Sequence, residues 1–249
     1  MVWSPPPFPV LLAEGEVHLW RAPLDLAGPE LAGLRRTLSP EESARAERFR
    51  FPAAQNRFAA ARGSLRTILA RYCHADPGSL QFGYGPAGKP CLASGDGPDF
   101  SVSHSHSRAL YGIVRGREIG VDLERIGKPS LDHERIAERF FSPAEAAYLR
   151  SLPPESRAES FFRLWTLKEA YVKALGEGLR IPLASFEVSI APGRPEASLR
   201  SANYGPARED WFLASVDPGS GYAAAVAVPG RAPRLEFWDF VGPSEDKAD

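Results

Sequence analysis

Hydrophobic positions along this chain follow two periods, and the two periods recur in the same order in each half. Short runs in which apolar residues alternate with polar ones predict strands, and longer runs with apolar residues three or four apart predict helices. The predicted long helices cover about residues 56–72 and about 160–175. The predicted early strands lie at 17–20 and 121–124, around Phe82 and around Phe186.

These elements form an internal repeat. The strands that begin at Val17 and Val121 are offset by 121 − 17 = 104 residues. Ser39 and Ser142, offset by 142 − 39 = 103, each precede Pro and are followed three residues later by Glu, which predicts a capping box at a helix start. Each half is expected to end in a hairpin, formed by 100–103 with 110–114 and by 211–216 with 222–228.

The repeat predicts an α+β fold of two pseudo-duplicated halves, residues 1–116 and 117–249. Each half is expected to be a small antiparallel sheet packed on a long helix, with the active site in the cleft between the halves and the metal site carried by the second. The last predicted strand, residues 234–240, can join either sheet.

Composition narrows the choice of partner and compartment. The chain has 249 residues, 43% of them apolar, with 30 Lys and Arg against 31 Asp and Glu. This balance gives no net field for nucleic acid or membrane, and no apolar run reaches the roughly 18 residues of a membrane span. The two cysteines form no CxxC pair, which favours a reducing, cytoplasmic location.

The strand Ile119–Glu124 carries the sharpest chemical pattern. Asp122 and Glu124 share one face, about 7 Å apart, while the residues between them point into the core. Two carboxylates at this distance repel each other unless a cation lies between them. The alternative is an edge strand whose polar face is simply solvated.

A second pattern lies on the later long helix. Trp165, Glu169 and Lys173 are spaced by four and share a face. Taken alone, Glu169 and Lys173 are an ordinary helical ion pair. Taken with the two strand carboxylates, Glu169 becomes a third oxygen ligand suited to Mg²⁺, beside a lysine that can meet a phosphate.

Three weaker patterns have equally plain structural interpretations. The run from Ser101 to Ser107 gathers hydroxyls and imidazoles at a strand end, which suits an anion or an ordinary polar loop. A turn at 85–90 holds Lys89 rigidly. The basic residues on and before the first long helix are either a phosphate site or a solvated face: Arg45, Arg48, Arg57, Arg62 and Arg66.

Together these motifs resemble the Sfp-type 4′-phosphopantetheinyl transferases. That family's (I/V)G(I/V)DxE strand and WxxKExxxK helix are matched at 119–124 and 165–173, with 169 − 122 = 47 residues between acidic positions. Its SHS and GKP elements are matched at 103–105 and 88–90, and its RFFS helix start at 139–145.

The resemblance implies a role for each matching position. It makes Asp122, Glu124 and Glu169 magnesium ligands, and Lys173 a contact to the coenzyme A diphosphate that helps the leaving group. It implies catalytic roles for Lys168, which lies beside these residues in the motif, and for Glu145. In some members of the family the glutamate at the position of Glu145 is a proposed general base. It also implies that the following residues bind coenzyme A: Arg45, Arg57, Lys89, Ser103, His104 and Lys173.

Two positions qualify this assignment. Glu145 also completes the capping box that starts at Ser142, so the sequence supports a structural role equally well. Glu42 stands where the family often has a lysine, which weakens the expected clamp on the coenzyme A 3′-phosphate.

The resemblance implies that the protein moves phosphopantetheine from coenzyme A to a serine of an apo acyl or peptidyl carrier protein, with Mg²⁺ as cofactor. The carrier would belong to a polyketide, nonribosomal peptide or fatty-acid synthase, and a monomer is expected because both halves lie in one chain. Two alternatives stay open: a metal-dependent phosphodiesterase, and a coenzyme A binding protein without catalysis.

Overall fold

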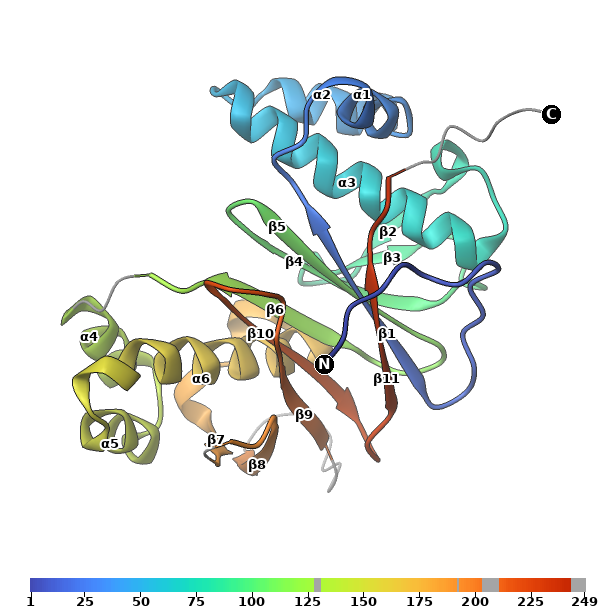
Figure 1. Ribbon diagram of the computed structural model, residues 1–249. Helices are drawn as coiled ribbons and strands as arrows, with labels where there is room; N and C mark the ends of the chain where they lie inside the picture. The colour runs from blue at the N-terminus through green and yellow to red at the C-terminus, as the bar shows by residue number, and fades with distance from the viewer. Residues whose placement is uncertain (128–130, 192, 203–210, 243–249) are drawn as a thin grey trace.

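The computed structural model describes residues 1–127, 131–191, 193–202 and 211–242 (Figure 1). The first half contains the strands β1 (Glu16–Pro23), β2 (Phe82–Tyr84), β3 (Pro90–Leu92), β4 (Asp99–Ser105) and β5 (Arg108–Val114). Its helices are α1 (Gly28–Arg36), α2 (Pro40–Glu47), α3 (Pro52–Cys73) and the 3₁₀ turn η1 (Pro77–Ser79).

The second half repeats this order of elements. Its strands are β6 (Gly120–Arg125), β7 (Phe186–Ile190), β8 (Glu196–Ala202), β9 (Trp211–Val216), β10 (Tyr222–Pro229) and β11 (Arg234–Asp239). Its helices are α4 (Leu131–Phe140), α5 (Pro143–Ser151), α6 (Pro154–Leu175) and the turns η2 (Gly178–Arg180) and η3 (Leu183–Ser185).

Both long helices begin earlier than the apolar period predicts. Each has 22 residues and opens with a proline in its first turn, Pro52 in α3 and Pro154 in α6. Proline is tolerated there because the first helical N–H groups have no partner within the helix. The first turn of each helix lies outside the stretch with the apolar period, so the period alone does not predict where the helix begins.

The sheets confirm the α+β prediction with one correction. The strand orders are β11-β1-β5-β4 and β6-β10-β9-β8-β7, with β2 and β3 paired separately. The prediction of purely antiparallel sheets is wrong for the first sheet, because β11 pairs in parallel with β1. The last strand therefore returns from the second half to complete the first sheet, and the division at 116/117 remains a description of the sequence repeat.

The elements stack as helix, sheet, sheet and helix, with α3 and α6 on the outside (Figure 1). Alternate residues of β1 show the layering: Trp20 and Ala22 pack toward α3, and Val17 and Leu19 pack toward the other sheet. The predicted cleft is therefore largely filled by an apolar core that β1 and β5 share with β6, β9 and β10. The polar residues lie at an edge of this core, where β4 meets β6.

In the described part of the chain, no helix is long and apolar enough to cross a membrane. Cys73 and Cys91 are both free thiols.

Candidate active site

The carboxylates of β6 face α6, as the strand pattern predicts. Val121 and Leu123 are fully buried in the core between the sheets, so Asp122 and Glu124 point to the opposite side. Gly120 lies on that same side, two residues before Asp122. A Cβ at Gly120 would overlap the backbone of α6 at Ala170 and Ala174. The glycine therefore permits the close strand–helix contact that places the carboxylates beside α6.

Asp122 is the centre of a compact polar contact between the two halves. Its Oδ1 accepts hydrogen bonds from Ser103 Oγ at 2.9 Å and from Lys173 Nζ at 2.7 Å. Lys173 also donates to Ser103 Oγ at 2.9 Å. Asp122 is only 3% exposed, whereas about a third of the Lys173 side chain is exposed. The structure thus joins β4, β6 and α6 through three residues that the sequence predicted as site residues.

The surroundings of Glu124 and Glu169 disfavour the charged form of both carboxyls. Burial, followed by the charge of Asp122, raises the pKa of both carboxyls. Lys173 offsets this effect only in part. Ser105 Oγ donates to Glu124 Oε2 at 3.0 Å. Buried carboxyls whose pKa is raised beside a further carboxylate form an environment that favours a cation.

The donor set fits Mg²⁺, although the ligands are not preassembled. Among the described residues, no three His, Cys, Asp or Glu side chains form a ready metal cluster. However, Asp122 Oδ2 is buried without a hydrogen-bond partner. A buried, unpaired carboxylate oxygen is costly, and a hard cation would satisfy it. The residues that would hold the ion are Asp122, Glu124 and Glu169.

A pocket of about 210 Å³ adjoins this cluster and is lined by residues of both halves, including Gly88, Lys89, Lys173 and Gly176. Lys89 Nζ donates to Ile119 O at 2.8 Å and to Ala174 O at 3.4 Å, and burial lowers its pKa. Lys89 therefore ties the predicted GKP turn to the second half. His104 follows Ser103 in β4, and desolvation followed by the charge of Lys173 lowers its pKa.

Glu145 and Lys168 form a buried ion pair with each other. Lys168 is fully buried, and its Nζ lies 2.7 and 2.8 Å from the two oxygens of Glu145 and 2.7 Å from Phe186 O. Backbone N–H groups of Ser142 and Val188 donate to the same carboxylate. With both oxygens occupied, Glu145 is poorly placed to accept a substrate proton. The geometry favours the capping-box interpretation and a structural role for both residues.

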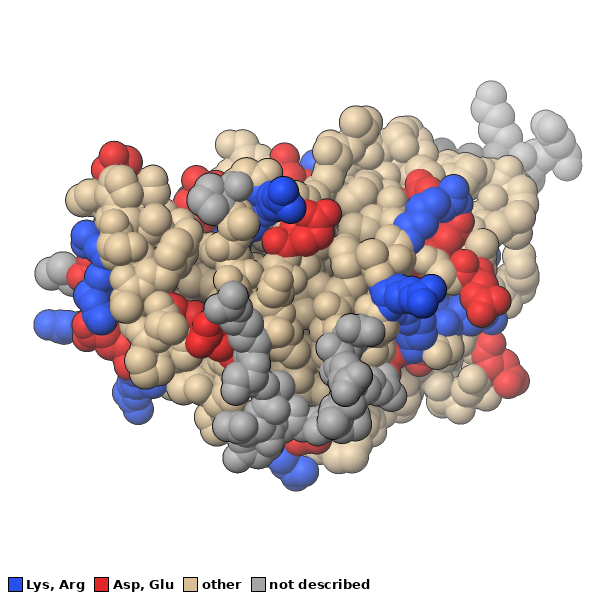
Figure 2. Space-filling model, turned by 90° about the horizontal axis from the view of Figure 1, so that it is seen from below, with Lys and Arg blue, Asp and Glu red and all other residues tan. Residues whose placement is uncertain are grey.

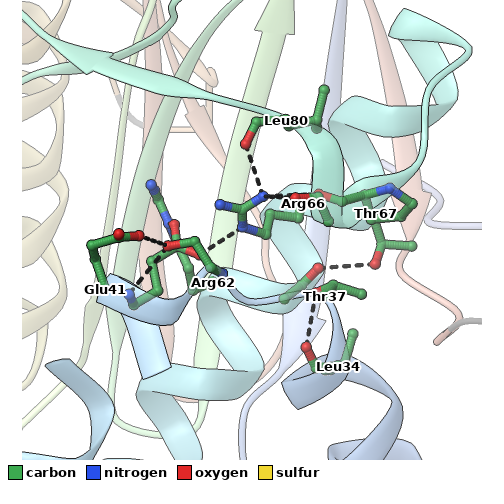
Figure 3. Close-up of polar contacts among 12 residues, drawn as sticks. Leu34, Thr37, Glu41, Arg62, Arg66, Thr67 and Leu80 are labelled. Carbon is green, nitrogen blue, oxygen red and sulfur yellow. Dashed lines mark hydrogen bonds and ion pairs between the residues drawn. The ribbon is translucent and has the colours of Figure 1, made fainter. Parts of the chain in front are cut away.

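The first half contains the matching arrangement (Figure 3). Glu42, 9% exposed, closes the capping box with Ser39 and forms ion pairs with Arg62 and with Arg66, the latter at 2.6 Å. Arg66 also donates to Pro77 O and Leu80 O, each at 2.9 Å. Glu42 therefore joins α2 to α3, and its presence in place of a lysine has a packing reason.

The two predicted phosphate-binding arginines make contacts within the first half. Arg57 Nε donates to Asp25 Oδ1 at 2.6 Å, in an exposed pair that lowers the pKa of Asp25. Arg45 lies over the Phe58 ring, 5.3 Å from its centroid. Neither contact joins these arginines to the carboxylate cluster.

Only the second half carries the cluster. With the strand offset of 104 and the helix offset of 154 − 52 = 102, its charged residues correspond to His18, Trp20, Thr67 and Arg71 in the first half. There, His18 Nδ1 and Trp20 Nε1 each lie 2.8 Å from the hydroxyl of Tyr72. Burial lowers the pKa of His18. A buried hydrogen-bonded group of His18, Trp20 and Tyr72 thus stands in place of the carboxylates.

The sequence analysis did not predict that Ser101 and Ser105 of β4 form hydrogen bonds with the backbone of β6. Their hydroxyls accept from the backbone N–H groups of Val121 and Arg125, each at 3.1 Å. The signal was present, because the serines at 101, 103 and 105 alternate with other residues and so share one side of a strand.

Comparisons with known proteins identify the family to which this chain is related. A family model described as the 4′-phosphopantetheinyl transferase superfamily matches residues 118–227. The 4′-phosphopantetheinyl transferase HetI of Nostoc sp. is 44% identical over 241 residues, which cover 96% of this chain and 98% of that protein. The transferase Sfp of Bacillus subtilis is 29% identical over 192 residues, 77% of this chain and 83% of that protein.

Among solved structures, a holo-(acyl-carrier-protein) synthase from Bacillus anthracis covers 45% of this chain and 94% of its own. Its sequence identity is 20% and its TM-score 0.38.

Proposed function

The chain belongs to the 4′-phosphopantetheinyl transferase superfamily, and we propose that it transfers 4′-phosphopantetheine from coenzyme A to a serine of an apo carrier protein. In this reaction the serine oxygen bonds to the β-phosphorus of coenzyme A. The bond from that phosphorus to the oxygen of 3′,5′-ADP breaks, and the serine proton passes to water. The products are the holo-carrier and 3′,5′-ADP.

One observation carries the proposal: Lys173, Ser103 and Asp122 meet where the two halves join, beside a pocket lined by both. A cation and a hydroxyl presented next to buried carboxylates suit a diphosphate that is itself bound to a metal ion. The relative HetI, which is matched over nearly its whole length, supports the same activity.

We assign the cofactor Mg²⁺ to Asp122, Glu124 and Glu169. When bound, the ion would neutralise charge on the diphosphate and favour attack at phosphorus. The ammonium of Lys173 would bind the diphosphate and stabilise the departing oxygen. Ser103 and His104 would orient the phosphates, and Lys89 would fix the turn that forms one wall of the pocket.

The wider assignments follow from the same architecture. Both halves contribute to the site, so a second copy of the chain is not required, and a monomer is proposed. The partner is an acyl or peptidyl carrier of a polyketide, nonribosomal peptide or fatty-acid synthase, and the proposed location is the cytoplasm.

The phosphodiesterase and binding-protein alternatives differ in products. On the face seen in Figure 2, basic and acidic side chains are interspersed and no continuous basic track crosses it, which does not favour a nuclease groove. Chromatography of nucleotide products separates the three activities. A transferase releases 3′,5′-ADP only when an apo-carrier is added. Release without carrier supports the phosphodiesterase, and no release with coenzyme A bound supports the binding protein.

A further inference from the structure

Three serines of β4 form a row along the free edge of β6. Ser101 Oγ accepts from Val121 N, and Ser105 Oγ accepts from Arg125 N, each at 3.1 Å. The offset is the same at both ends, 121 − 101 = 20 and 125 − 105 = 20, so the two strands run parallel. Ser103 lies between them in the row.

This row connects the edge strands of two separate sheets. β4 is the last strand of the first sheet and β6 the first strand of the second. Backbone N–H groups at the edge of a sheet need hydrogen-bond partners, above all a buried one such as that of Val121. Here serine hydroxyls accept these hydrogen bonds, in the place of the carbonyls of a neighbouring strand.

A hydroxyl differs from a carbonyl because it also has a hydrogen to donate. Ser103 donates to Asp122 Oδ1 at 2.9 Å, and Ser105 donates to Glu124 Oε2 at 3.0 Å. Each of these serines is therefore fixed by one group and in turn orients a carboxylate. Ser101 has only its backbone partner among these contacts.

We propose that Ser105 is a positioning residue that holds Glu124 in the orientation required to bind the metal ion. This inference rests on the proposed function, because Glu124 is a metal ligand only under that proposal. Ser105 belongs to the first half of the molecule and orients the Glu124 carboxylate of the second half. Correct docking of the two halves is thereby coupled to assembly of the metal site.

The row itself supplies the control. Ser105→Ala removes the donor to Glu124 and the acceptor for Arg125 N. Ser101→Ala removes an acceptor for a backbone N–H at the same distance but touches no carboxylate. Ser105→Thr keeps the hydroxyl and is the conservative variant.

The test is the affinity of each full-length variant for Mn²⁺ alone, measured by electron paramagnetic resonance, with urea unfolding as a measure of stability. We expect Ser105→Ala to weaken Mn²⁺ binding by about tenfold or more, as is usual when a group that orients a ligand is removed. Ser105→Thr should restore most of this affinity. Ser101→Ala should retain wild-type affinity even where it lowers stability.

The inference is overturned if Ser105→Ala binds Mn²⁺ like the wild type, or if Ser101→Ala weakens binding equally. Carrier modification by the wild-type protein separates this result from failure of the proposed function. If the wild type neither binds Mn²⁺ nor modifies a carrier, both proposals fail. If it does both and Ser105→Ala is unchanged, only the role of Ser105 fails.

Discussion

Lys168 and Glu145 form a fully desolvated ion pair, with Nζ 2.7 and 2.8 Å from the two carboxylate oxygens. Arg66 and Glu42 form the corresponding pair in the first half, at 2.6 Å. In both pairs the acid closes a capping box and the base extends from the following long helix. The duplication therefore includes a specific packing arrangement as well as the order of the elements.

This arrangement predicts that Glu145 acts through stability. Glu145→Ala should lower the free energy of unfolding by about 3–5 kcal/mol, because it leaves the Lys168 charge buried without its partner. Urea denaturation measures the loss, and the double variant Glu145→Leu/Lys168→Met should recover part of it. The opposite result, an unchanged stability with transfer reduced more than about a hundredfold, would make Glu145 the general base.

Gly120 is expected to tolerate no side chain. In Gly120→Ala the methyl group would overlap the α6 backbone, so the helix must shift and carry Glu169 and Lys173 with it. We expect a large loss of both stability and transfer. Gly242→Ala, at a glycine with nothing within 4 Å, is the matched control. Normal thermal unfolding and normal turnover of Gly120→Ala would contradict the close contact.

Glu169 should destabilise the metal-free protein at neutral pH. Its pKa is raised above 4.5 by burial and by the charges of Asp122 and Glu124, against the attraction of Lys173. The folded state therefore holds this proton more tightly than the unfolded state, and wild-type stability falls as pH rises from 4.5 through the raised pKa.

Glu169→Gln lacks this charge, so without metal it should be more stable than the wild type at pH 8. The difference should vanish below pH 4.5, where Glu169 is protonated in both the folded and the unfolded state of the wild type. Adding Mg²⁺ at pH 8 should stabilise the wild type and leave the variant unchanged. A variant that is less stable than the wild type at pH 8 would indicate an ordinary helical ion pair with Lys173.

Arg57 is expected to act on the 3′-phosphate of coenzyme A. Arg57→Ala should raise the KM for coenzyme A about tenfold, since a hydrogen bond to a charged group contributes about 1.5–3 kcal/mol. The KM for 3′-dephospho-coenzyme A should stay unchanged. Asp25→Asn, which removes the present partner of Arg57, should lower the KM for coenzyme A. Equal effects on both substrates would remove Arg57 from the phosphate site.

The sequence predicted most elements because their patterns are local. Both capping boxes, the two hairpins and the face of β6 that carries Asp122 follow from local spacing, and the repeat follows when these local patterns are compared between the halves. The strand that pairs with β11 could not be predicted in this way. A strongly β-forming run indicates that a strand exists, but it does not indicate which strand lies beside it. Its position beside β1 depends on how the two halves dock.

The candidate site was predictable by residue type but not in its contacts. Asp122, Ser103 and Lys173 were expected near one another, and they share hydrogen bonds. The motif around Lys168 gave no sign that Lys168 points to the opposite side of α6 into a buried pair with Glu145. Its burial and pairing depend on how three elements, α5, α6 and β7, pack together, which spacing within α6 alone does not show.

Intact-mass spectrometry of apo-carrier proteins shows whether this protein transfers phosphopantetheine. Acyl and peptidyl carriers are incubated with the protein, coenzyme A and Mg²⁺, with EDTA and Glu169→Gln as controls. We predict that at least one carrier gains the mass of one phosphopantetheine, and that EDTA or Glu169→Gln removes the gain. Unmodified carriers throughout the panel, with coenzyme A bound to the protein, would contradict the account.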